Sequence, residues 1–578
     1  MCGIAGIIGR EASADAAQAM SARIAHRGPD GDGIWQAPGV ALAHRRLAIL
    51  DPTPAGAQPM QFGAHVLTYN GELYNFHALR ATIDAPLHSN CDTEVLLHLL
   101  ARDGKRCLPE LVGMFAFAVW NQERRELFAA RDRLGIKPLY YRVLADGIAF
   151  ASELKALLVL GTPAIDRSAV RDFLFHGYIP APKTIYQGIA KLPAGHWLSW
   201  QDGKLEVERY WEPSLEIRLR DRQMSLEGLD ALLRTVVPEH TLSDVPVGVF
   251  LSGGMDSALT AYYLGAPRTF TLGFEADERS EADAARAVAA HLGTRHTAMS
   301  ASSADLDTGL NTITQIFDEP FADSAAWSNF LIAGCARRDV TVALSGEGGD
   351  EIFCGYPRYW SAVGARSTSL NRALAAWLPP LSRFGQSMQR HALTGLPGFS
   401  AALGALTAEQ VNALLHPAWL ESDYDYDWFY RKFWRESLEP LAQLRWLDIN
   451  TNLPEGLLVK VDRTSMAHSL EVRPPLLDHR LVEFMLGVDP QLLVDRGARR
   501  GKLLVRELMQ PRLPPGHLER PKSGFGLPTH RWIGRHPQMW TDAVRRLMER
   551  GVLRGPVSSD FRRAWSVLVL DRWFSAFA

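Results

Sequence analysis

The chain has 578 residues, of which 47% are hydrophobic and 22% charged, and its formal net charge is −2. A chain of this length exceeds what one hydrophobic core supports, so we expect a globular protein of two or more domains. The small net charge gives no indication of a nucleic-acid partner, and no apolar run is long enough to cross a membrane. The five cysteines are scattered without metal-binding spacing and the N-terminus lacks a signal-peptide pattern, which favours a cytoplasmic location.

The first chemically informative residue is Cys2, which directly follows the initiator methionine. If that methionine is removed, the free α-amino group, with an ordinary pKa of about 7.7–8.0, can act as general base for the thiol of the same residue. A lone cysteine near a terminus is more often a buried structural residue. Four further segments favour the nucleophile: residues 26–30 (HRGPD), 44–49 (HRRLAI), 69–75 (YNGELYN) and 91–94 (CDTE).

These segments, in this order and continuing to residues 131–140 (RDRLGIKPLY), resemble the class II glutamine amidotransferases, which use an N-terminal cysteine. The Asn70 amide and the Gly71 N–H are suitable donors for the oxyanion of amide hydrolysis. Arg46 can bind the α-carboxylate of glutamine, while Glu72 and Asp92 can bind its α-ammonium. Considered in isolation, Arg46 or Asp92 is more simply interpreted as a member of a surface ion pair. The resemblance implies a glutamine pocket made of Arg46, Leu47, Ala48, Ile49, Leu50, Asn70, Gly71, Glu72 and Asp92.

The periodicity of the N-terminal half predicts short strands separated by turns, with helices at residues 12–25 and 93–102. The strands are expected at residues 40–43, 66–69, 115–120, 127–130 and 139–143. This pattern suits two stacked, mostly antiparallel sheets with helices outside. The resemblance implies the four-layer αββα fold of the N-terminal-nucleophile (Ntn) type.

A charged stretch without clear period, at residues 193–225, is predicted to connect this half to the next. We therefore expect a glutaminase domain at residues 2–212 and a second domain at 213–578. In the second domain, strands at 247–251, 269–273 and 340–344 alternate with helices at 257–264, 281–292 and 324–337. This alternation predicts a parallel α/β sheet with helical cover, whose ligands bind at the carboxyl ends of the strands. Residues 367–416 are expected to form packing helices.

The strongest motif of the second domain is Ser-Gly-Gly-Met-Asp-Ser at residues 252–257, directly after an apolar strand. Gly253 and Gly254 let the backbone approach a ligand, while Ser252, Ser257 and backbone N–H groups can hold an anion at a helix N-terminus. Asp256 would repel a phosphate unless a cation lies between them, which indicates magnesium-bound polyphosphate. The string resembles the pyrophosphate loop of the ATP pyrophosphatases, and no Walker motif occurs.

Two later segments complete the predicted ATP site. Residues 345–351 (SGEGGDE) offer Asp350 as a second magnesium ligand and Glu347 as a base or acceptor-binding group. Part of residues 460–478 fits an ordinary amphipathic helix, but Lys460 and Arg463 could also neutralise the leaving pyrophosphate. The adenosine is expected to be framed by Leu251, Leu272, Ser345 and Gly346.

Over nearly the whole chain, the two halves in this order resemble the glutamine-dependent asparagine synthetases of the bacterial type. The resemblance implies glutamine, aspartate and ATP as substrates, Mg²⁺ as cofactor and a homodimer, with Arg358 a candidate for the aspartate α-carboxylate. Departures from the family pattern leave a sugar carboxylate or another small acid open as the acceptor; they are Cys91, Gly349, Cys354, Pro474 and Leu476. A binding or regulatory protein on a decayed scaffold is the alternative from another class.

Overall fold

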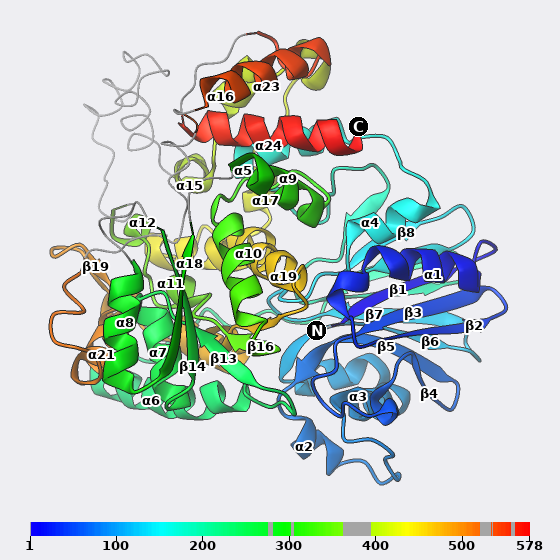
Figure 1. Cartoon of the computed structure of the whole chain (residues 1–578), viewed down its shortest axis with the longest axis horizontal. Coiled ribbons are helices and arrows are strands. Elements are labelled where there is room, and N and C mark those ends of the chain that lie inside the picture. The colour runs from blue at the N-terminus through cyan, green and yellow to red at the C-terminus, as the bar shows by residue number, and fades with distance from the viewer. Residues whose placement is uncertain are drawn as a thin grey trace.

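The computed structural model describes residues 2–274, 281–301, 306–361, 395–520, 533, 536–555 and 561–578. The N-terminal half forms two antiparallel sheets, and the C-terminal half is built around one parallel sheet (Figure 1). The predicted α/β and α+β classes are thereby confirmed for the two halves. Residues 367–394, part of the segment predicted to form packing helices, lie outside the described residues.

The two N-terminal sheets have six strands each. The first has the order β10-β8-β9-β1-β3-β2, with β1 Gly3–Ile8, β2 Gly31–Ala37, β3 Val40–Arg46, β8 Tyr140–Val143, β9 Ile148–Ala151 and β10 Ile189–Lys191. The second has the order β12-β11-β7-β6-β5-β4, with β4 Met60–Phe62, β5 His65–Leu73, β6 Gly113–Asn121, β7 Glu126–Arg131, β11 His196–Gln201 and β12 Lys204–Arg209. The helices of this half are α1 Ala14–Arg23, α2 Phe76–Arg80, α3 Asp92–Asp103, α4 Leu154–Leu157 and α5 Arg167–His176.

Alternation along the strands explains why the two sheets stack. Alternate side chains of a strand point to the same face of its sheet. Those on the inner faces form one shared core between the two sheets, which includes Ile4 and Ile8 of β1 and Ala116 and Ala118 of β6. Helix α1 covers the outer face of the first sheet and α3 covers that of the second. This is the four-layer αββα arrangement, and it leaves Cys2 at the start of the central strand β1.

The third sheet is parallel throughout, in the order β15-β14-β13-β16-β17. Its strands are β13 Val247–Phe250, β14 Arg268–Phe274, β15 Arg295–Ala301, β16 Val342–Leu344 and β17 Glu471–Arg473, and a small hairpin joins β18 Val494–Asp495 to β19 Arg500–Gly501. The helices are α6 Arg222–Glu239, α7 Met255–Leu264, α8 Glu281–Leu292, α9 Leu306–Phe317, α10 Ala325–Ala336, α11 Gly349–Ile352, α12 Pro357–Ser361, α15 Gly395–Leu403, α16 Ala408–Leu414, α17 Trp428–Arg431, α18 Pro440–Asn450, α19 Leu458–Met466, α20 His479–Leu486, α21 Leu503–Met509, α23 Pro537–Glu549 and α24 Phe561–Phe577.

One prediction of local structure needs correction. Part of the predicted connection, residues 193–225, belongs to the second sheet as β11 and β12, whose hairpin alternation was hidden by exposed charges such as Glu206 and Glu208. The helix predicted in part of residues 460–478 is α19, which ends at Met466 before the chain forms β17 beside β16. Strand β17 places its first residue, Glu471, opposite Val342, so the edge of the sheet is completed by a segment far away in sequence.

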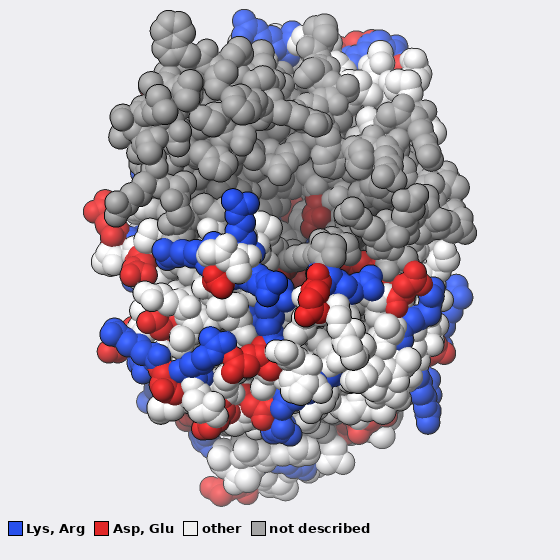
Figure 2. Space-filling view, turned by 90° about the vertical axis from the view of Figure 1, so that its left-hand side faces the viewer, with Lys and Arg blue, Asp and Glu red and all other residues white. Residues whose placement is uncertain are grey.

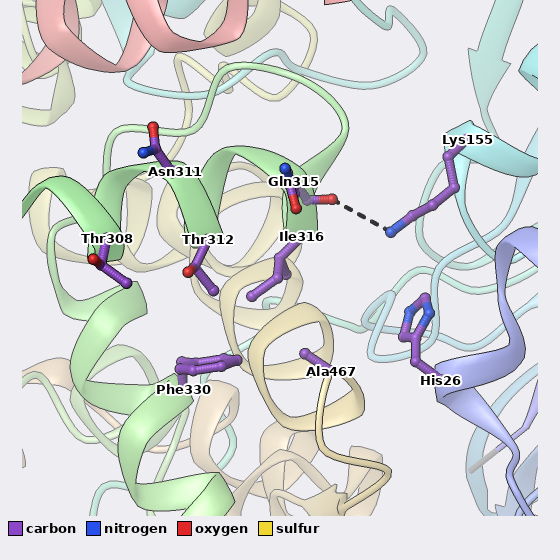
Figure 3. Close-up of a pocket in the computed structure, with 9 residues that line it drawn as sticks. All are labelled: His26, Lys155, Thr308, Asn311, Thr312, Gln315, Ile316, Phe330 and Ala467. Carbon is purple, nitrogen blue, oxygen red and sulfur yellow. Dashed lines mark hydrogen bonds between the residues drawn. The ribbon is translucent and has the colours of Figure 1, made fainter. Parts of the chain in front are cut away.

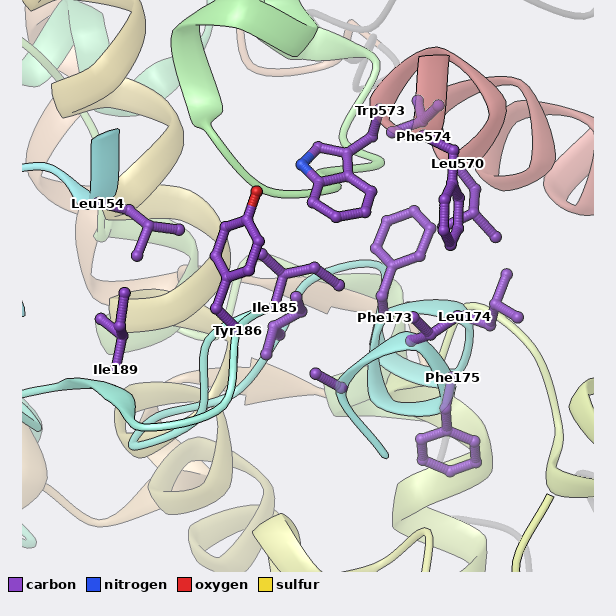
Figure 4. Packing of buried hydrophobic residues seen from close by; sticks show 14 of the residues in the cluster. Leu154, Phe173, Leu174, Phe175, Ile185, Tyr186, Ile189, Leu570, Trp573 and Phe574 are labelled. Carbon is purple, nitrogen blue, oxygen red and sulfur yellow. The ribbon is translucent and has the colours of Figure 1, made fainter. Parts of the chain in front are cut away.

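The C-terminal helices return to the N-terminal half. Figure 4 shows Leu570, Trp573 and Phe574 of α24 facing Phe173 of α5 and Tyr186, and all belong to one buried cluster. The indole N–H of Trp573 also donates to the carbonyl of Asp318 at 2.9 Å. Burial of this apolar surface fixes the two halves against each other.

The outer surface carries charges of both signs. On the face shown in Figure 2, Lys and Arg side chains are interleaved with Asp and Glu over the described residues. No helix in the described part of the chain is long and apolar enough to cross a membrane.

Candidate active sites

The N-terminal site is built around Cys2, which is 9% exposed. Its backbone nitrogen donates to Oδ1 of Asn70 at 2.9 Å, and its carbonyl accepts from Nε of Arg27 at 3.0 Å. The thiol contacts the carbonyl of Leu47, with Sγ and O 3.9 Å apart. Burial raises the pKa of the Cys2 thiol, so a nearby base is needed to form the thiolate.

Asn70 presents an unused donor beside this cysteine. It lies on β5, fully buried, and its Nδ2 atom has no hydrogen-bond partner within the described part of the chain. A buried amide donor without a partner is costly, which is the expected state of a group kept for a ligand. Its neighbour Gly71 lies opposite Phe115, and a Cβ there would come within 2.3 Å of the Met114 carbonyl oxygen.

The residues predicted to grip glutamine come from β3, the loop after it, β5 and the start of α3. Arg46 ends β3 and donates from Nη1 to the carbonyl of Thr53 at 2.7 Å. Asp92 opens α3, and its Oδ2 accepts from the Tyr69 hydroxyl at 2.8 Å; burial raises the pKa of Asp92 to about 6 against this bond. The remaining predicted pocket residues, Leu47, Ala48, Ile49 and Leu50, form the loop after β3.

Glu72 connects this pocket to the C-terminal half. Its Oε1 lies 3.2 Å from Nη2 of Arg473, on β17, while its Oε2 is buried and has no hydrogen-bond partner among the described residues. Burial raises the pKa of Glu72 well above its usual value, although Arg473 opposes this. Arg473 also pairs with Glu471 at 2.5 Å, so one strand of the parallel sheet contacts a residue of the predicted glutamine pocket.

The C-terminal site begins with the strand–loop–helix unit of β13 and α7. Gly253 has a φ of +70°, and a Cβ there would lie 2.9 Å from the backbone nitrogen of Ala285, so the sharp turn requires glycine. The Ser257 hydroxyl accepts from the backbone nitrogen of Ser252 at 3.1 Å and donates to the carbonyl of Gly254. The loop is therefore held as a cradle at the N-terminus of α7, with Asp256 in its first turn.

Neighbouring strands bring the other predicted loops to this cradle. A Cβ on Gly346 would lie 2.7 Å from the backbone nitrogen of Ser257, so the two loops touch. The backbone nitrogen of Ser345 donates to the carbonyl of Arg473 at 2.9 Å. The side chains of Leu251 and Leu272 are buried in hydrophobic clusters, so only their backbone is available to frame an adenosine.

Asp256 and Asp350, predicted as magnesium ligands, meet at a third residue. Nζ of Lys502 lies 2.5 Å from Oδ1 of Asp350 and is hydrogen-bonded to Oδ2 of Asp256. The side chains of all three are largely buried, with exposed fractions of 9% for Lys502 and 18% for each aspartate. Burial lowers the pKa of Lys502, but the two carboxylates outweigh it and raise the pKa above its usual value.

Lys460 faces the same site from α19. Its ammonium donates to Oδ2 of Asp323 at 2.8 Å, and the pKa of Lys460 is raised by Asp323 and Glu347 against the effect of burial. Burial raises the pKa of Glu347, which Lys460 opposes. Lys460, Glu347 and Asp323 thus form a charged group, and Glu347 lies near enough to Asp256 and Asp350 for their charges to raise its pKa further.

Arg463 and Arg358 both pair with protein carboxylates. The guanidinium of Arg463 pairs with Glu153 of the N-terminal half at 2.5 Å and with Asp318, just after α9, at 3.1 Å. Positions three apart lie on the same face of a helix, but the long side chains of Lys460 and Arg463 reach different carboxylates, Asp323 for the first and Glu153 with Asp318 for the second. Arg358 donates two hydrogen bonds to Asp448, of 3.0 and 2.9 Å, which leaves it committed to that carboxylate.

Helix α19 therefore joins the two sites. Asp462 accepts two hydrogen bonds from Arg27, of 2.8 and 3.1 Å, and Arg27 in turn holds the Cys2 carbonyl. Beside this network a cavity of about 340 Å³ opens between the halves; Figure 3 shows Lys155 and His26 on one side and α9 on the other. Lys155 pairs with Glu153 and Asp318 at its edge.

Sequence reasoning assigned no role to several residues of these sites: Arg27, Glu153, Asp323, Asp462, Glu471, Arg473 and Lys502. Arg27 and Arg473 lie inside motifs that were singled out, so their motifs were the available signal. Lys502 follows Arg499 and Arg500 in a charged stretch that resembles an ordinary solvated surface. The sequence therefore contained no signal that marks Lys502 as a site residue.

Known proteins match both halves. A family model described as "Glutamine amidotransferase domain" matches residues 1–211, and one described as "Asparagine synthase" matches residues 228–572. The chain belongs to the asparagine synthase family. It is 30% identical over its full length to asparagine synthetase [glutamine-hydrolyzing] 1 of Bacillus subtilis, covering 96% of that protein.

Other relatives of this asparagine synthase family member carry different names. A putative asparagine synthetase of Mycobacterium bovis is 33% identical over the full chain, which covers 97% of it. A protein named amidase chry2, from Gibberella zeae, is 27% identical over 88% of this chain and 84% of its own length. An amidotransferase domain joined to an asparagine synthase domain makes the chain an ATP-dependent, glutamine-hydrolysing ligase.

Proposed function

We propose that this family member is a glutamine-dependent asparagine synthetase, which amidates aspartate and releases AMP and pyrophosphate. The observation that carries the proposal is the pairing of two sites through one helix. At one, Cys2 faces the unsatisfied amide of Asn70; at the other, a phosphate loop meets two carboxylates. Neither site alone forms an amide from glutamine nitrogen.

The first half-reaction follows from the position of Cys2. Once Met1 is removed, the backbone nitrogen of Cys2 becomes a free amine beside Asn70 Oδ1. This amine can take the proton of the Cys2 thiol directly or through water. The sulfur attacks the amide carbon of glutamine, and Asn70 Nδ2, with the predicted help of the Gly71 N–H, donates to the oxyanion. One such donor is worth about 10²–10³-fold in rate. Ammonia leaves, and water cleaves the thioester to glutamate.

Charges around the pocket support glutamine as the donor. Arg46 is the proposed partner of the α-carboxylate, and Asp92 and the free Oε2 of Glu72 are the proposed partners of the α-ammonium. A carboxylate buried without a partner is expensive, and an incoming ammonium removes that cost. The raised pKa values of Glu72 and Asp92 agree with a pair of acids waiting for a cation.

The second half-reaction uses the loop at residues 252–257. Backbone N–H groups and the Ser252 and Ser257 hydroxyls are proposed to hold the pyrophosphate part of ATP, with Lys460 close to the charge that develops on it. The donor set of Asp256 and Asp350 fits Mg²⁺, because both are hard oxygen ligands and phosphates and waters can complete the shell. Bound there, the ion would neutralise the polyphosphate and orient it.

The acceptor chemistry places a carboxylate next to the α-phosphate. The β-carboxylate of aspartate displaces pyrophosphate to give an acyl adenylate; ammonia then attacks the acyl carbon, and AMP leaves with the bonding electrons. Glu347, whose pKa burial raises, is suited to take the proton that the attacking ammonia loses. Ammonia is protonated in water, so we expect it to travel between the sites inside the protein.

A second candidate keeps this chemistry and changes the acceptor to a sugar carboxylate or another small acid. It is favoured by the position of Arg358, which pairs with Asp448 and so leaves the α-carboxylate of aspartate without its predicted partner. Incubating enzyme, ATP, magnesium and ammonia with each acceptor separates the two, because a site that pairs a polar group rejects analogues lacking it by about 10⁴-fold. Amidation of a sugar acid without asparagine formation would refute the aspartate assignment.

We also propose a domain division near residue 212, a cytoplasmic location and a homodimer. The first is supported by the segment between β12 and α6, which belongs to neither main sheet. The second rests on the scattered cysteines and the third on family resemblance alone.

A further inference from the structure

Lys502 occupies the point where the two proposed magnesium ligands converge. Its ammonium contacts Oδ1 of Asp350 at 2.5 Å and Oδ2 of Asp256, from a segment almost 250 residues later in the chain than Asp256. Among the described contacts, one ammonium bridges two carboxylates, which are the oxygen ligands that a divalent cation also takes.

The surroundings force Lys502 into this position. Its backbone adopts a left-handed conformation, with φ of +58°, which persists only where neighbouring contacts over-determine it. Its N–H donates to the carbonyl of Phe353 at 3.1 Å, and its carbonyl accepts from the N–H of Arg506 at 2.8 Å. These bonds anchor the backbone from both sides while the side chain reaches into the site.

Two glycines make room for the three side chains. A Cβ on Gly355 would lie 1.9 Å from Oδ1 of Asp350 and 2.1 Å from Cε of Lys502. A Cβ on Gly349 would lie 2.5 Å from Cγ of Asp256. The group is therefore closely packed by backbone that leaves no space for a side chain, as expected of a built site rather than a chance surface contact.

We propose that Lys502 holds the place of the divalent cation in the nucleotide-free enzyme and is released when the metal and ATP bind, its ammonium then pairing with a phosphate. A divalent cation alone must displace the ammonium from both carboxylates and leave it without a counter-charge in a buried site, which is unfavourable. ATP supplies that counter-charge. Metal and nucleotide therefore bind cooperatively, and Lys502 carries the coupling.

The proposal rests on the proposed ATP-dependent function, but its first test needs no nucleotide. Binding of Mn²⁺, a paramagnetic substitute for Mg²⁺, is measured by electron paramagnetic resonance on the full chain without ATP. In Lys502→Met we expect Mn²⁺ to bind about tenfold more tightly or better, since typical coupling between ligands is about 5–150-fold. Lys502→Arg keeps the positive charge and should bind Mn²⁺ as weakly as the wild type.

The second measurement adds ATP. In the wild type, ATP should tighten Mn²⁺ binding by a larger factor than in Lys502→Met, while pyrophosphate release in that variant should fall by about 10²-fold. The matched control is Lys183→Met, which removes another partly buried lysine, paired with Asp172 at 2.8 Å, away from the loop. It should change neither Mn²⁺ binding nor its response to ATP.

Unchanged or weaker Mn²⁺ binding in a folded Lys502→Met protein, judged by retained glutaminase activity, would overturn the proposal and make Lys502 a structural ion pair. If the methionine variant does not fold, Lys502→Gln makes the same comparison with a polar, uncharged side chain. A wild-type enzyme that never releases pyrophosphate from ATP would refute the proposed function instead. The nucleotide-free comparison would then still decide what Lys502 does.

Discussion

Substitution of Arg463 distinguishes the catalytic role predicted from the sequence from the structural role that its buried ion pairs indicate. Its guanidinium, 1% exposed, lies 2.5 Å from Glu153 and 3.1 Å from Asp318, and those carboxylates are buried to the same degree. Arg463→Met keeps an unbranched, flexible stem and removes the charged guanidinium. We expect this change to destabilise the contact between the two halves while leaving the chemistry at the phosphate loop largely intact.

The expected loss in free energy of unfolding depends on which cations still contact Glu153 and Asp318 in the variant. Breaking a buried ion pair by removing one partner costs about 3–5 kcal/mol, because the other charge is left buried. Lys155 still contacts both carboxylates, at 3.0 and 3.2 Å, and Arg27 still contacts Glu153 at 2.8 Å. These remaining cations place the expected loss at the lower end of that range, about 3 kcal/mol.

Urea unfolding followed by tryptophan fluorescence measures this loss, taken from the first cooperative transition because a chain of two domains need not unfold in one step. The matched control is Arg222→Met, which removes an exposed pair with Glu507 and should cost about 1 kcal/mol or less. Ammonia-dependent pyrophosphate release by the folded Arg463→Met protein should stay within about tenfold of wild type, which corresponds to about 1.4 kcal/mol.

Acidification provides a second check. Burial opposes ionisation of Glu153, but Arg463, Lys155 and His26 outweigh it and hold its pKa well below the usual range. A depressed pKa contributes stability that is present above the unfolded value of about 4.3 and is lost as the pH falls through the folded value. The difference between wild type and Arg463→Met should therefore shrink below about pH 4. A variant of unchanged stability that loses pyrophosphate release by 10²-fold or more would contradict this assignment.

Three further results are expected. Cys2→Ala should lose glutaminase activity and glutamine-dependent amidation but retain amidation with free ammonia, and mass spectrometry of the wild type should show a chain lacking Met1; continued use of glutamine would exclude Cys2 as the nucleophile. Asp256→Asn or Asp350→Asn should lower pyrophosphate release by about 10²-fold, or about 2.7 kcal/mol, with little change in glutaminase activity; near-normal release would make either residue structural. The kcat/KM for glutamine should rise with pH through about 6, as Asp92 ionises to meet the substrate ammonium, and Asp92→Asn should abolish that step; an unaltered pH profile would exclude Asp92 from binding.

The sequence by itself determined the elements and the two motifs that begin the sites. Alternating and helical periods predicted β6, β7, α8 and α10 to within a few residues, because local backbone preference and one-sided burial are written in neighbouring side chains. The Ser-Gly-Gly-Met-Asp-Ser string predicted a strand, a glycine turn and a helix start, since only glycine fits the φ of +70° at Gly253. The position of Cys2 after Met1 predicts a nucleophile on equally local grounds, and this stays a prediction.

Tertiary structure alone decided which charges meet. Nothing near Lys502 in the sequence indicates that its ammonium lies between Asp256 and Asp350, and nothing near Arg463 shows that it faces Glu153 instead of the nucleotide. The short β17 gains its identity from pairing with β16, and Arg473 on it reaches Glu72 in the other half. Ion pairs act through space over a few ångströms, so their partners are chosen by packing of distant elements, which local sequence does not encode.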